Sequence, residues 1–335
     1  MSSSDKAIVV SKVSKTFEFK THKGVRGFLY PETTAVRAVD GVSFDVPRGE
    51  SLAFIGPNGA GKSTTIKMLT GILQPTTGTV QVLGMRPLEQ RRELAMKIGT
   101  VFGQRSQLIF NLPLTESFRL TASMYRVQRA EAAKRVEKLI GQFDLGEFVT
   151  QPVRKLSLGQ RMRAEVANAL IYNPEIIFLD EPTIGLDIVA KRALREVIKT
   201  VNREQGTTVF LTSHDVGDIE EVCTRTMIVN HGQIVLDAQT ADLKKNYLRR
   251  KAVSVVPIAA WLDRSAPAQW AERAKIADVQ PEGKDGRLLF TVDTTKNALN
   301  DFLRELLAQI PVADMTIEDT PLEDIIHELY TKDRQ

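Results

Sequence analysis

The segment GPNGAGKST, at residues 56–64, restricts the fold of this 335-residue chain more than any other stretch of its sequence. A short apolar run, SLAFI at 51–55, precedes it, and Ile66, Leu69 and Leu73 recur after it at helical spacing. A strand, a glycine-rich turn and a helix in this order predict a loop whose backbone N–H groups surround a phosphate. The predicted phosphate-binding residues are Gly56, Pro57, Asn58, Gly59, Ala60, Gly61, Lys62, Ser63 and Thr64.

Two side chains of this loop carry chemistry that few other residue types could supply. Lys62 has the reach and the charge to contact the β- and γ-phosphates of a nucleotide, and the Ser63 hydroxyl is a typical Mg²⁺ ligand in such loops. A glycine-rich turn with an incidental lysine is the alternative, but the flanking strand and helix patterns favour a nucleotide site. The sequence therefore predicts that the chain binds the phosphates of a nucleotide together with Mg²⁺.

A pair of carboxylates follows a second buried-type strand, IIFLD at 176–180. Acidic residues at a strand end are most often only solvated. In a chain that also has a phosphate loop, we expect Asp180 to help hold Mg²⁺ and Glu181 to orient or deprotonate the attacking water. The next strand, VFLT at 209–212, leads to His214, whose imidazole could contact the γ-phosphate, although a lone histidine is usually structural or exposed.

The wider pattern predicts the fold class. Helical patterns dominate residues 115–173, and short apolar strands then alternate with helices. This alternation is typical of a parallel α/β core, here with a helical segment in its middle.

The stretch LSLGQRMRAEVANAL, at 156–170, admits two interpretations. In the first, Ser157 and Gln160 form the capping box of a helix, and the apolar residues that follow make one buried stripe. In the second, the helix N-terminus is directed at a negatively charged group. The two interpretations are compatible, because orphan N–H groups at a helix start are suitable partners for a phosphate.

Composition excludes several classes of protein. Apolar residues make up 42% of the chain and charged residues 26%, which is ordinary for a globular protein. No run approaches the roughly 18 apolar residues of a membrane span, the start lacks a secretory signal pattern, and Cys223 is a single cysteine, so we expect a cytoplasmic protein. The 45 basic and 41 acidic residues form a mixed surface, and no nucleic acid partner is expected.

Composition changes after the basic linker DLKKNYLRRK, at 242–251. Two strand patterns and one amphipathic helix pattern follow, and a capping box at Thr320 predicts a last helix. We therefore expect a nucleotide-binding domain at residues 1–243 and a small α+β accessory domain at 244–335.

In combination, the motifs of about residues 5–240 resemble the nucleotide-binding subunits of ATP-binding cassette (ABC) transporters. In that family an aromatic residue near the N-terminus stacks on adenine, and Phe17 occupies its place. Residues 56–64 resemble the Walker A loop and residues 176–181 the Walker B strand. LSLGQ resembles the signature motif, in which Leu158 replaces a commoner glycine.

The resemblance assigns roles to further residues. Ser157, Gly159 and Gln160 are retained from the signature motif, Asp187 corresponds to the D-loop, and His214 to the switch histidine. The Q-loop glutamine, a catalytic and metal-binding residue in the family, could be either of two residues in VFGQRSQL. We favour Gln104, directly after Val-Phe-Gly, over Gln107.

The family fold is a P-loop ATPase with a RecA-like core, an antiparallel β subdomain and an α-helical subdomain, here at about 105–173. The resemblance implies that two ATPase subunits, identical or paralogous, close head to tail, with each ATP held by Walker A of one and the signature helix of the other. It also implies separate permease subunits of about six membrane helices, an exporter, and a place on the cytoplasmic face of the inner membrane.

Three alternatives remain open at this stage. An importer ATPase whose C-terminal domain senses substrate shares the same motifs. A soluble, non-transporting ABC protein is disfavoured, because the chain shows one cassette and no sustained heptads. The basic stretch at 20–36, with Phe28, Leu29 and Tyr30, is expected to be an insertion that is either an amphipathic element for the permease or membrane, or a surface loop.

Overall fold

The computed structural model describes residues 5–21, 32–102, 106–213, 215–247, 250–257, 282–284, 287–293 and 299–319. The chain divides into two compact units, Met1–Thr240 and Ala241–Gln335, close to the boundary expected between residues 243 and 244.

The first unit is built around a six-stranded sheet in the order β5-β6-β7-β3-β8-β9. Its strands are β3 (Ser51–Ile55), β5 (Ile98–Phe102), β6 (Ile176–Asp180), β7 (Thr208–Thr212), β8 (Arg225–Asn230) and β9 (Gln233–Gln239). Neighbouring strands from β5 to β8 run parallel, and β9 runs antiparallel to β8. The prediction of a parallel α/β core is confirmed.

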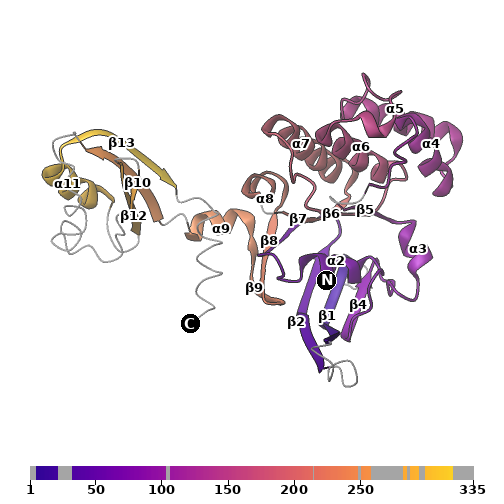
Figure 1. Cartoon of the computed structure of the whole chain (residues 1–335), viewed down its shortest axis with the longest axis horizontal. Helices are drawn as coiled ribbons and strands as arrows, with labels where there is room; N and C mark the ends of the chain where they lie inside the picture. The colour runs from indigo at the N-terminus through magenta and orange to yellow at the C-terminus, as the bar shows by residue number, and fades with distance from the viewer. Residues whose placement is uncertain are drawn as a thin grey trace. The chain divides into compact units, whose positions relative to one another are not determined.

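Helices and a second sheet enclose this core (Figure 1). The helices α4 to α7 lie on one side of the six-stranded sheet, and the small antiparallel sheet lies on the other. The helices of the first unit are α2 (Lys62–Leu69), α3 (Arg91–Ala95), α4 (Leu114–Met124), α5 (Arg129–Gln142), the 3-10 turn η2 (Val153–Lys155), α6 (Leu158–Leu170), α7 (Ile188–Gln205) and α8 (Val216–Val222).

Two helix predictions have different outcomes. The buried stripe expected on α6 is confirmed, because Met162, Val166, Ala169 and Leu170 are each at most 4% exposed. The prediction that Leu73 continues the helix after the phosphate loop was wrong. That helix ends at Leu69, and Gly71 follows with φ of 71°, a left-handed conformation that does not continue a helix.

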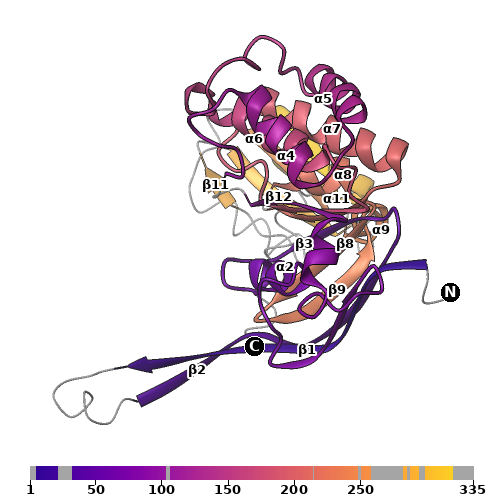
Figure 2. The same cartoon turned by 90° about the vertical axis from the view of Figure 1, so that its right-hand side faces the viewer.

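The antiparallel sheet has the order β2-β1-β4, with β1 (Lys6–Thr21), β2 (Glu32–Pro47) and β4 (Thr77–Val82). Strands β1 and β2 form a long hairpin that extends away from the body of the unit (Figure 2). Phe19 pairs with Thr34 and Thr21 with Glu32, so the ends of the 20–36 segment are strand and not insertion loop. Backbone pairing with a distant strand is a non-local effect that the local composition did not reveal. Phe28, Leu29 and Tyr30 lie outside the described residues.

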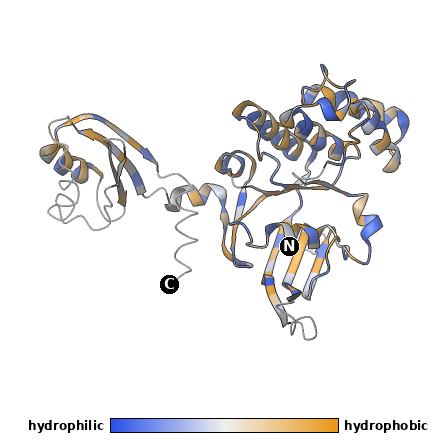
Figure 3. Ribbon diagram, viewed as in Figure 1, coloured by the Kyte–Doolittle hydropathy of each residue, from blue (hydrophilic) through white to orange (hydrophobic). Residues whose placement is uncertain are grey.

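Aromatic side chains fill the layer between the two sheets of the first unit. Phe54 and Phe210 are both at most 1% exposed, and their ring centroids are 5.3 Å apart. Phe44 reaches this pair from β2, with 5.8 Å between its ring centroid and that of Phe54. The helices, by contrast, alternate hydrophilic and hydrophobic residues along their length, as a half-buried helix requires (Figure 3).

The second unit has its own four-stranded antiparallel sheet in the order β11-β12-β10-β13. Its described elements are α9 (Thr240–Tyr247, which begins at the unit boundary), β10 (Arg250–Pro257), β11 (Glu282–Lys284), β12 (Arg287–Asp293), α11 (Leu299–Gln309) and β13 (Val312–Asp319). Phe302, Leu306 and Ile310 are buried against Val253 and Phe290 of this sheet. The helix expected after Thr320 lies outside the described residues.

No helix among the described residues has both the length and the apolar character needed to span a membrane.

Candidate functional site

Parallel pairing brings three strand ends to one edge of the six-stranded sheet. β7 lies between β3 and β6, and Asp180 at the end of β6 pairs directly with Thr212 at the end of β7. The phosphate loop leaves the end of β3 at Gly56. The phosphate loop therefore meets Asp180 and Glu181 at this edge, although more than a hundred residues separate the loop from these two carboxylates in the sequence.

Close backbone contacts fix the shape of the phosphate loop. A Cβ atom on Gly56 would lie 2.3 Å from the carbonyl oxygen of Val229, and one on Gly61 would lie 2.3 Å from that of Ala38. Gly61 also has φ of 100°, a conformation that favours glycine. The packing of the loop therefore requires glycine at these two positions.

Lys62, the first residue of α2, is 6% exposed and turns back across the loop. Its Nζ donates to the carbonyl oxygens of Gly56, at 2.6 Å, and Pro57, at 3.2 Å. Burial lowers the pKa of Lys62, while the nearby charges of Glu181 and Asp180 act in the opposite direction. The ammonium group is thus held over the loop, where a phosphate chain would bind.

Oxygen atoms of three elements converge beside this loop. The Ser63 hydroxyl donates to Asp180 Oδ1 at 3.3 Å, and the Thr212 hydroxyl donates to the same oxygen at 2.6 Å. Hydroxyl and carboxylate oxygens are the ligands that Mg²⁺ prefers, together with substrate phosphates and water. Ser63 and Asp180 therefore fit a magnesium site, and Thr212 orients the carboxylate.

Glu181 occupies a constrained position after β6. Its φ is 54°, in the left-handed region, and its backbone N–H donates to the carbonyl oxygen of Thr212 at 3.0 Å. Non-glycine residues in this region are uncommon and often lie at functional sites. The Glu181 carboxylate lies 4.0 Å from Lys62 Nζ, so the expected base and the expected phosphate ligand are adjacent.

The structure confirms the capping box at the start of α6. The Gln160 backbone N–H donates to Ser157 Oγ at 3.2 Å, and the Ser157 N–H donates to Gln160 Oε1 at 2.9 Å. Ser157 is exposed. The start of the signature helix is therefore an ordered, accessible helix N-terminus.

Leu158, the departure from the commoner signature sequence, contacts the predicted D-loop of its own chain. Its Cδ2 atom lies 2.9 Å from the place that a Cβ on Gly185 would occupy. Next to it, a Cβ on Gly159 would lie 3.0 Å from the Cβ of Ala190. The signature residues and the residues around Asp187 therefore pack against one another within one subunit.

Asp187 is the N-cap of α7, since its Oδ1 accepts a hydrogen bond from the Ala190 N–H at 2.8 Å. The residues beside it are apolar yet exposed, with Ile188 at 71% and Val189 at 78%. The start of α7 thus presents apolar surface close to the signature residues.

Phe17 lies on β1, half-buried, beside a second aromatic residue. The centroids of the Phe17 and Phe19 rings are 6.4 Å apart, and Lys15 Nζ is 5.2 Å from the Phe17 centroid. These three side chains share one face of the strand, because they alternate along it. Phe17 belongs to an aromatic and basic surface.

Gln104 and His214, two residues predicted to be catalytic, lie outside the described residues. The structure does describe Gln107, the alternative Q-loop residue. Its Nε2 donates to the carbonyl oxygen of Thr100 at 2.7 Å and to the Thr100 hydroxyl at 3.0 Å. The Gln107 side chain is therefore engaged with β5.

Sequence reasoning missed Glu165, a 6% exposed residue of α6. Its carboxylate accepts hydrogen bonds from the Ser106 hydroxyl and, at 3.1 Å, from the Gln107 backbone N–H. Burial raises the pKa of Glu165, and these hydrogen bonds oppose that rise. The missed signal was an acidic residue one turn after Met162, on the buried side of an otherwise apolar helix.

Comparisons with known proteins agree with the geometry. A sequence model for the family described as ABC transporter matches residues 39–184. The ABC transporter ATP-binding protein NatA of Bacillus subtilis is 33% identical over 200 residues, covering 60% of this chain and 81% of that protein. A fluoroquinolones export ATP-binding protein of Mycobacterium tuberculosis is 38% identical over 229 residues, covering 68% of this chain and 74% of that protein.

A solved structure shares the fold. A dimeric post-hydrolysis state of the ATP-binding cassette MJ0796, bound to ADP and Pi, matches with a TM-score of 0.60 and 26% sequence identity. The match covers 70% of this chain and 98% of that chain. The predicted P-loop ATPase fold is confirmed.

The Glu165 contacts predict a local effect of mutation. Glu165→Ala should leave the Ser106 hydroxyl and the Gln107 N–H without their partner, so residues 106–108 should open more often. We expect hydrogen exchange of the Gln107 amide to accelerate by about tenfold or more, because a hydrogen bond to a charged group stabilises by about 1.5–3 kcal/mol. Glu137→Ala, at an exposed glutamate of α5, is the control. Unchanged exchange at Gln107 would contradict the assignment.

Proposed function

This chain belongs to the ABC transporter family as an ATP-binding, ATP-hydrolysing subunit, and we propose that it drives export through separate permease subunits. The observation that carries the proposal is the convergence of Lys62, Ser63, Asp180 and Glu181 at one sheet edge. Fluoroquinolone export by one relative supports export as the direction of transport.

The proposed reaction is in-line attack of water on the γ-phosphate of ATP. Backbone N–H groups of residues 56–61 bind the phosphates, and Lys62 places its charge beside them. Glu181, adjacent to Lys62, orients or deprotonates the water. Mg²⁺, held by Ser63, Asp180 and Gln104, would neutralise phosphate charge when bound.

Residues outside the loop complete the nucleotide site. Phe17 stacks on adenine, and His214 contacts the γ-phosphate. We assign the Q-loop role to Gln104, which is supported by the engagement of Gln107 with Thr100.

A second ATPase subunit is the first proposed partner. The signature helix starts at an exposed N-terminus, which is a favourable place for a phosphate, while the phosphate loop of the same subunit already provides one such place. We assign Ser157, Gly159 and Gln160 to the nucleotide of the partner subunit, and Asp187 to the contact between the two sites.

Permease subunits are the second proposed partner, at the cytoplasmic face of the inner membrane. The segment after β5 exposes three large apolar side chains, Ile109 at 39%, Phe110 at 45% and Leu112 at 37%. Exposed apolar clusters of this kind are typical of protein interfaces. The guanidinium of Arg161 on α6 lies 5.6 Å from the centroid of the Phe110 ring, so this surface also touches the signature helix.

Glu181→Gln should separate binding from hydrolysis. The amide cannot accept the proton of water, so ATP turnover should fall about 100-fold or more while ATP still binds and an ATP-bound dimer accumulates. Steady-state turnover and gel filtration with ATP measure the two effects. Glu204→Gln, at an exposed residue near the end of α7, is the control. Unchanged turnover in Glu181→Gln would assign the base elsewhere.

Ser157→Arg should block closure of the dimer and spare ATP binding to the monomer. A bulky side chain at the N-terminus of the signature helix would occupy the place of the partner's phosphate. The double variant Ser157→Arg/Glu181→Gln should therefore remain monomeric with ATP, whereas Glu181→Gln alone dimerises. Gln128→Arg, at the exposed N-cap of α5, is the matched control. A normal ATP-dependent dimer would argue against the shared site.

Phe110→Glu should weaken docking to the permease. A charge in the apolar surface would have to be buried on assembly, so co-purification of permease subunits with the full chain should fall at least about tenfold. ATP binding should stay unchanged.

Capture of a substrate-binding protein together with the permease would contradict export and favour the importer alternative.

A further inference from the structure

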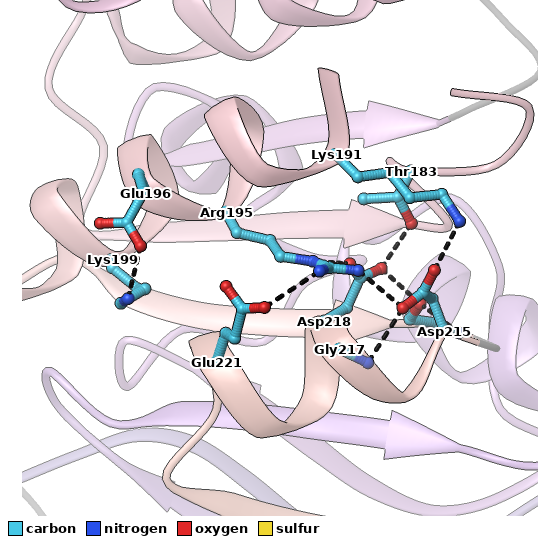
Figure 4. Close-up of polar contacts among 10 residues, drawn as sticks. Thr183, Lys191, Arg195, Glu196, Lys199, Asp215, Gly217, Asp218 and Glu221 are labelled. Carbon is cyan, nitrogen blue, oxygen red and sulfur yellow. Dashed lines mark hydrogen bonds and ion pairs between the residues drawn. The ribbon is translucent and has the colours of Figure 1, made fainter. Parts of the chain in front are cut away.

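A buried arginine of α7 lies at the centre of an ion cluster (Figure 4). Arg195 is 7% exposed, and its three guanidinium nitrogens donate to three carboxylates. Nε lies 2.7 Å from Asp218 Oδ1, Nη2 lies 2.6 Å from Asp215 Oδ1, and Nη1 lies 3.1 Å from Glu221 Oε1. Lys191, one turn earlier on α7, pairs with the other oxygen of Asp215. We call these five residues the Arg195 cluster.

The Arg195 cluster holds the chain on both sides of position 214. Before it, the Ser213 hydroxyl donates to Asp218 Oδ2 at 2.6 Å. After it, Asp215 is itself a member of the cluster, and its N–H donates back to the Ser213 hydroxyl at 2.9 Å. The segments that enter and leave His214 are thus bound to the same arginine through Asp218 and Asp215.

The same cluster holds the loop that follows Glu181. Thr183 stands two residues after Glu181, is 4% exposed, and donates its hydroxyl proton to Asp218 Oδ2. Asp218 is 1% exposed and accepts from three different segments: α7, the loop after β6 and the loop after β7. The Asp218 carboxylate therefore links the segment that follows Glu181 to the segment that precedes His214.

Packing leaves the guanidinium little freedom. A Cβ atom on Gly217 would lie 2.5 Å from Arg195 Nη1 and 2.7 Å from its Cζ, so the plane of the guanidinium rests directly on the start of α8. The Gly217 N–H also donates to Asp215 Oδ1 at 2.9 Å. The arginine is fixed by contact as well as by charge.

Stability alone is a weak explanation for the cluster. Burial by itself would raise the pKa of Asp215, yet the hydrogen bond from Lys191 and the charge of Arg195 bring it below its usual value. Buried ion pairs contribute little net stability compared with apolar residues of similar size, because desolvation offsets their attraction. An arginine with three oriented carboxylates does, however, impose a geometry that apolar packing would not.

We propose that Arg195 is a positioning residue for ATP hydrolysis, which sets the loops of Glu181 and His214 through Asp218 and Asp215. The inference rests on the proposed roles of Glu181 and His214. Because Asp187 is the N-cap of α7, the same helix joins this positioning group to the surface assigned to the second subunit.

Arg195→Lys tests the inference in the purified full chain. Lysine keeps the charge, but all its donors are on one nitrogen in place of the planar fork, so it cannot hold the three carboxylates in the same geometry. We expect kcat to fall about 10- to 100-fold, since displacements of about 1 Å have effects of this size. The Kd for ATP should change less than about threefold, because the Arg195 cluster contains none of the proposed phosphate-binding residues. A loss of kcat alone reports an interaction made in the transition state.

The control for Arg195→Lys is a substitution at a second arginine of α7. Arg192→Lys, at an exposed arginine of the same helix, should hydrolyse ATP as the wild type does. In the Glu181→Gln background, Arg195→Lys should still form the ATP-bound dimer. A kcat within about twofold of wild type would overturn the inference, and so would a parallel loss of kcat and ATP affinity, which reports general damage.

Thr183→Val provides a test that leaves the ion pairs intact. The substitution keeps the shape of the side chain and removes the hydroxyl that donates to Asp218. It should lower kcat without altering the Kd for ATP, and an unchanged kcat would overturn the inference. If Glu181→Gln itself hydrolysed ATP normally, the proposed function would fail instead, so the two failures are distinguishable.

Discussion

The parallel pairing of β3, β7 and β6 is the constraint on which the rest of this structure depends. The register places Asp180 directly beside Thr212. The Thr212 hydroxyl then donates a hydrogen bond to the Asp180 carboxylate, and the Thr212 carbonyl oxygen accepts one from the Glu181 N–H. A slip of one residue would turn each of these side chains to the opposite face of the sheet. The phosphate loop and both carboxylates therefore share one geometry only because the strands hold their register.

Two buried cations, Lys62 and Arg195, have different kinds of hydrogen-bond partner. Lys62 is held mainly by backbone carbonyl oxygens of its own loop, with Glu181 4.0 Å away, so it remains close to a place where negative charge would arrive. The guanidinium of Arg195, in contrast, forms ion pairs with three carboxylates, those of Asp215, Asp218 and Glu221. Oriented charges that need no rearrangement during a reaction are an effective means of stabilising a transition state.

Local patterns made much of the site predictable. The glycines and Lys62 belong to one continuous segment, and the capping box of Ser157 and Gln160 depends on four consecutive residues. Strand ends were predictable from short apolar runs. The same reasoning predicted the roles of Asp180 and Glu181, because Asp180 is the last residue of β6 and Glu181 follows it directly.

What the sequence did not reveal depends on contacts between distant segments. Glu165 meets Ser106 across 59 residues, and Arg195 meets Asp218 across 23, so nothing in the local pattern of either helix predicted these partners. The paired ends of the β1–β2 hairpin were missed for the same reason, because strand pairing is not encoded by the composition of one strand alone.

The contact of Leu158 with Gly185 has a consequence for assembly. Leu158 is the first residue of α6, and a glycine there would leave the start of the helix with more conformations to lose on binding the proposed second subunit. With leucine in contact with Gly185, part of that loss has already occurred in the folded chain, so the surface around Ser157 is preorganised for the proposed contact. In the proposed dimer, Leu158 would thus shift part of the entropic cost of association into the folding of the single chain.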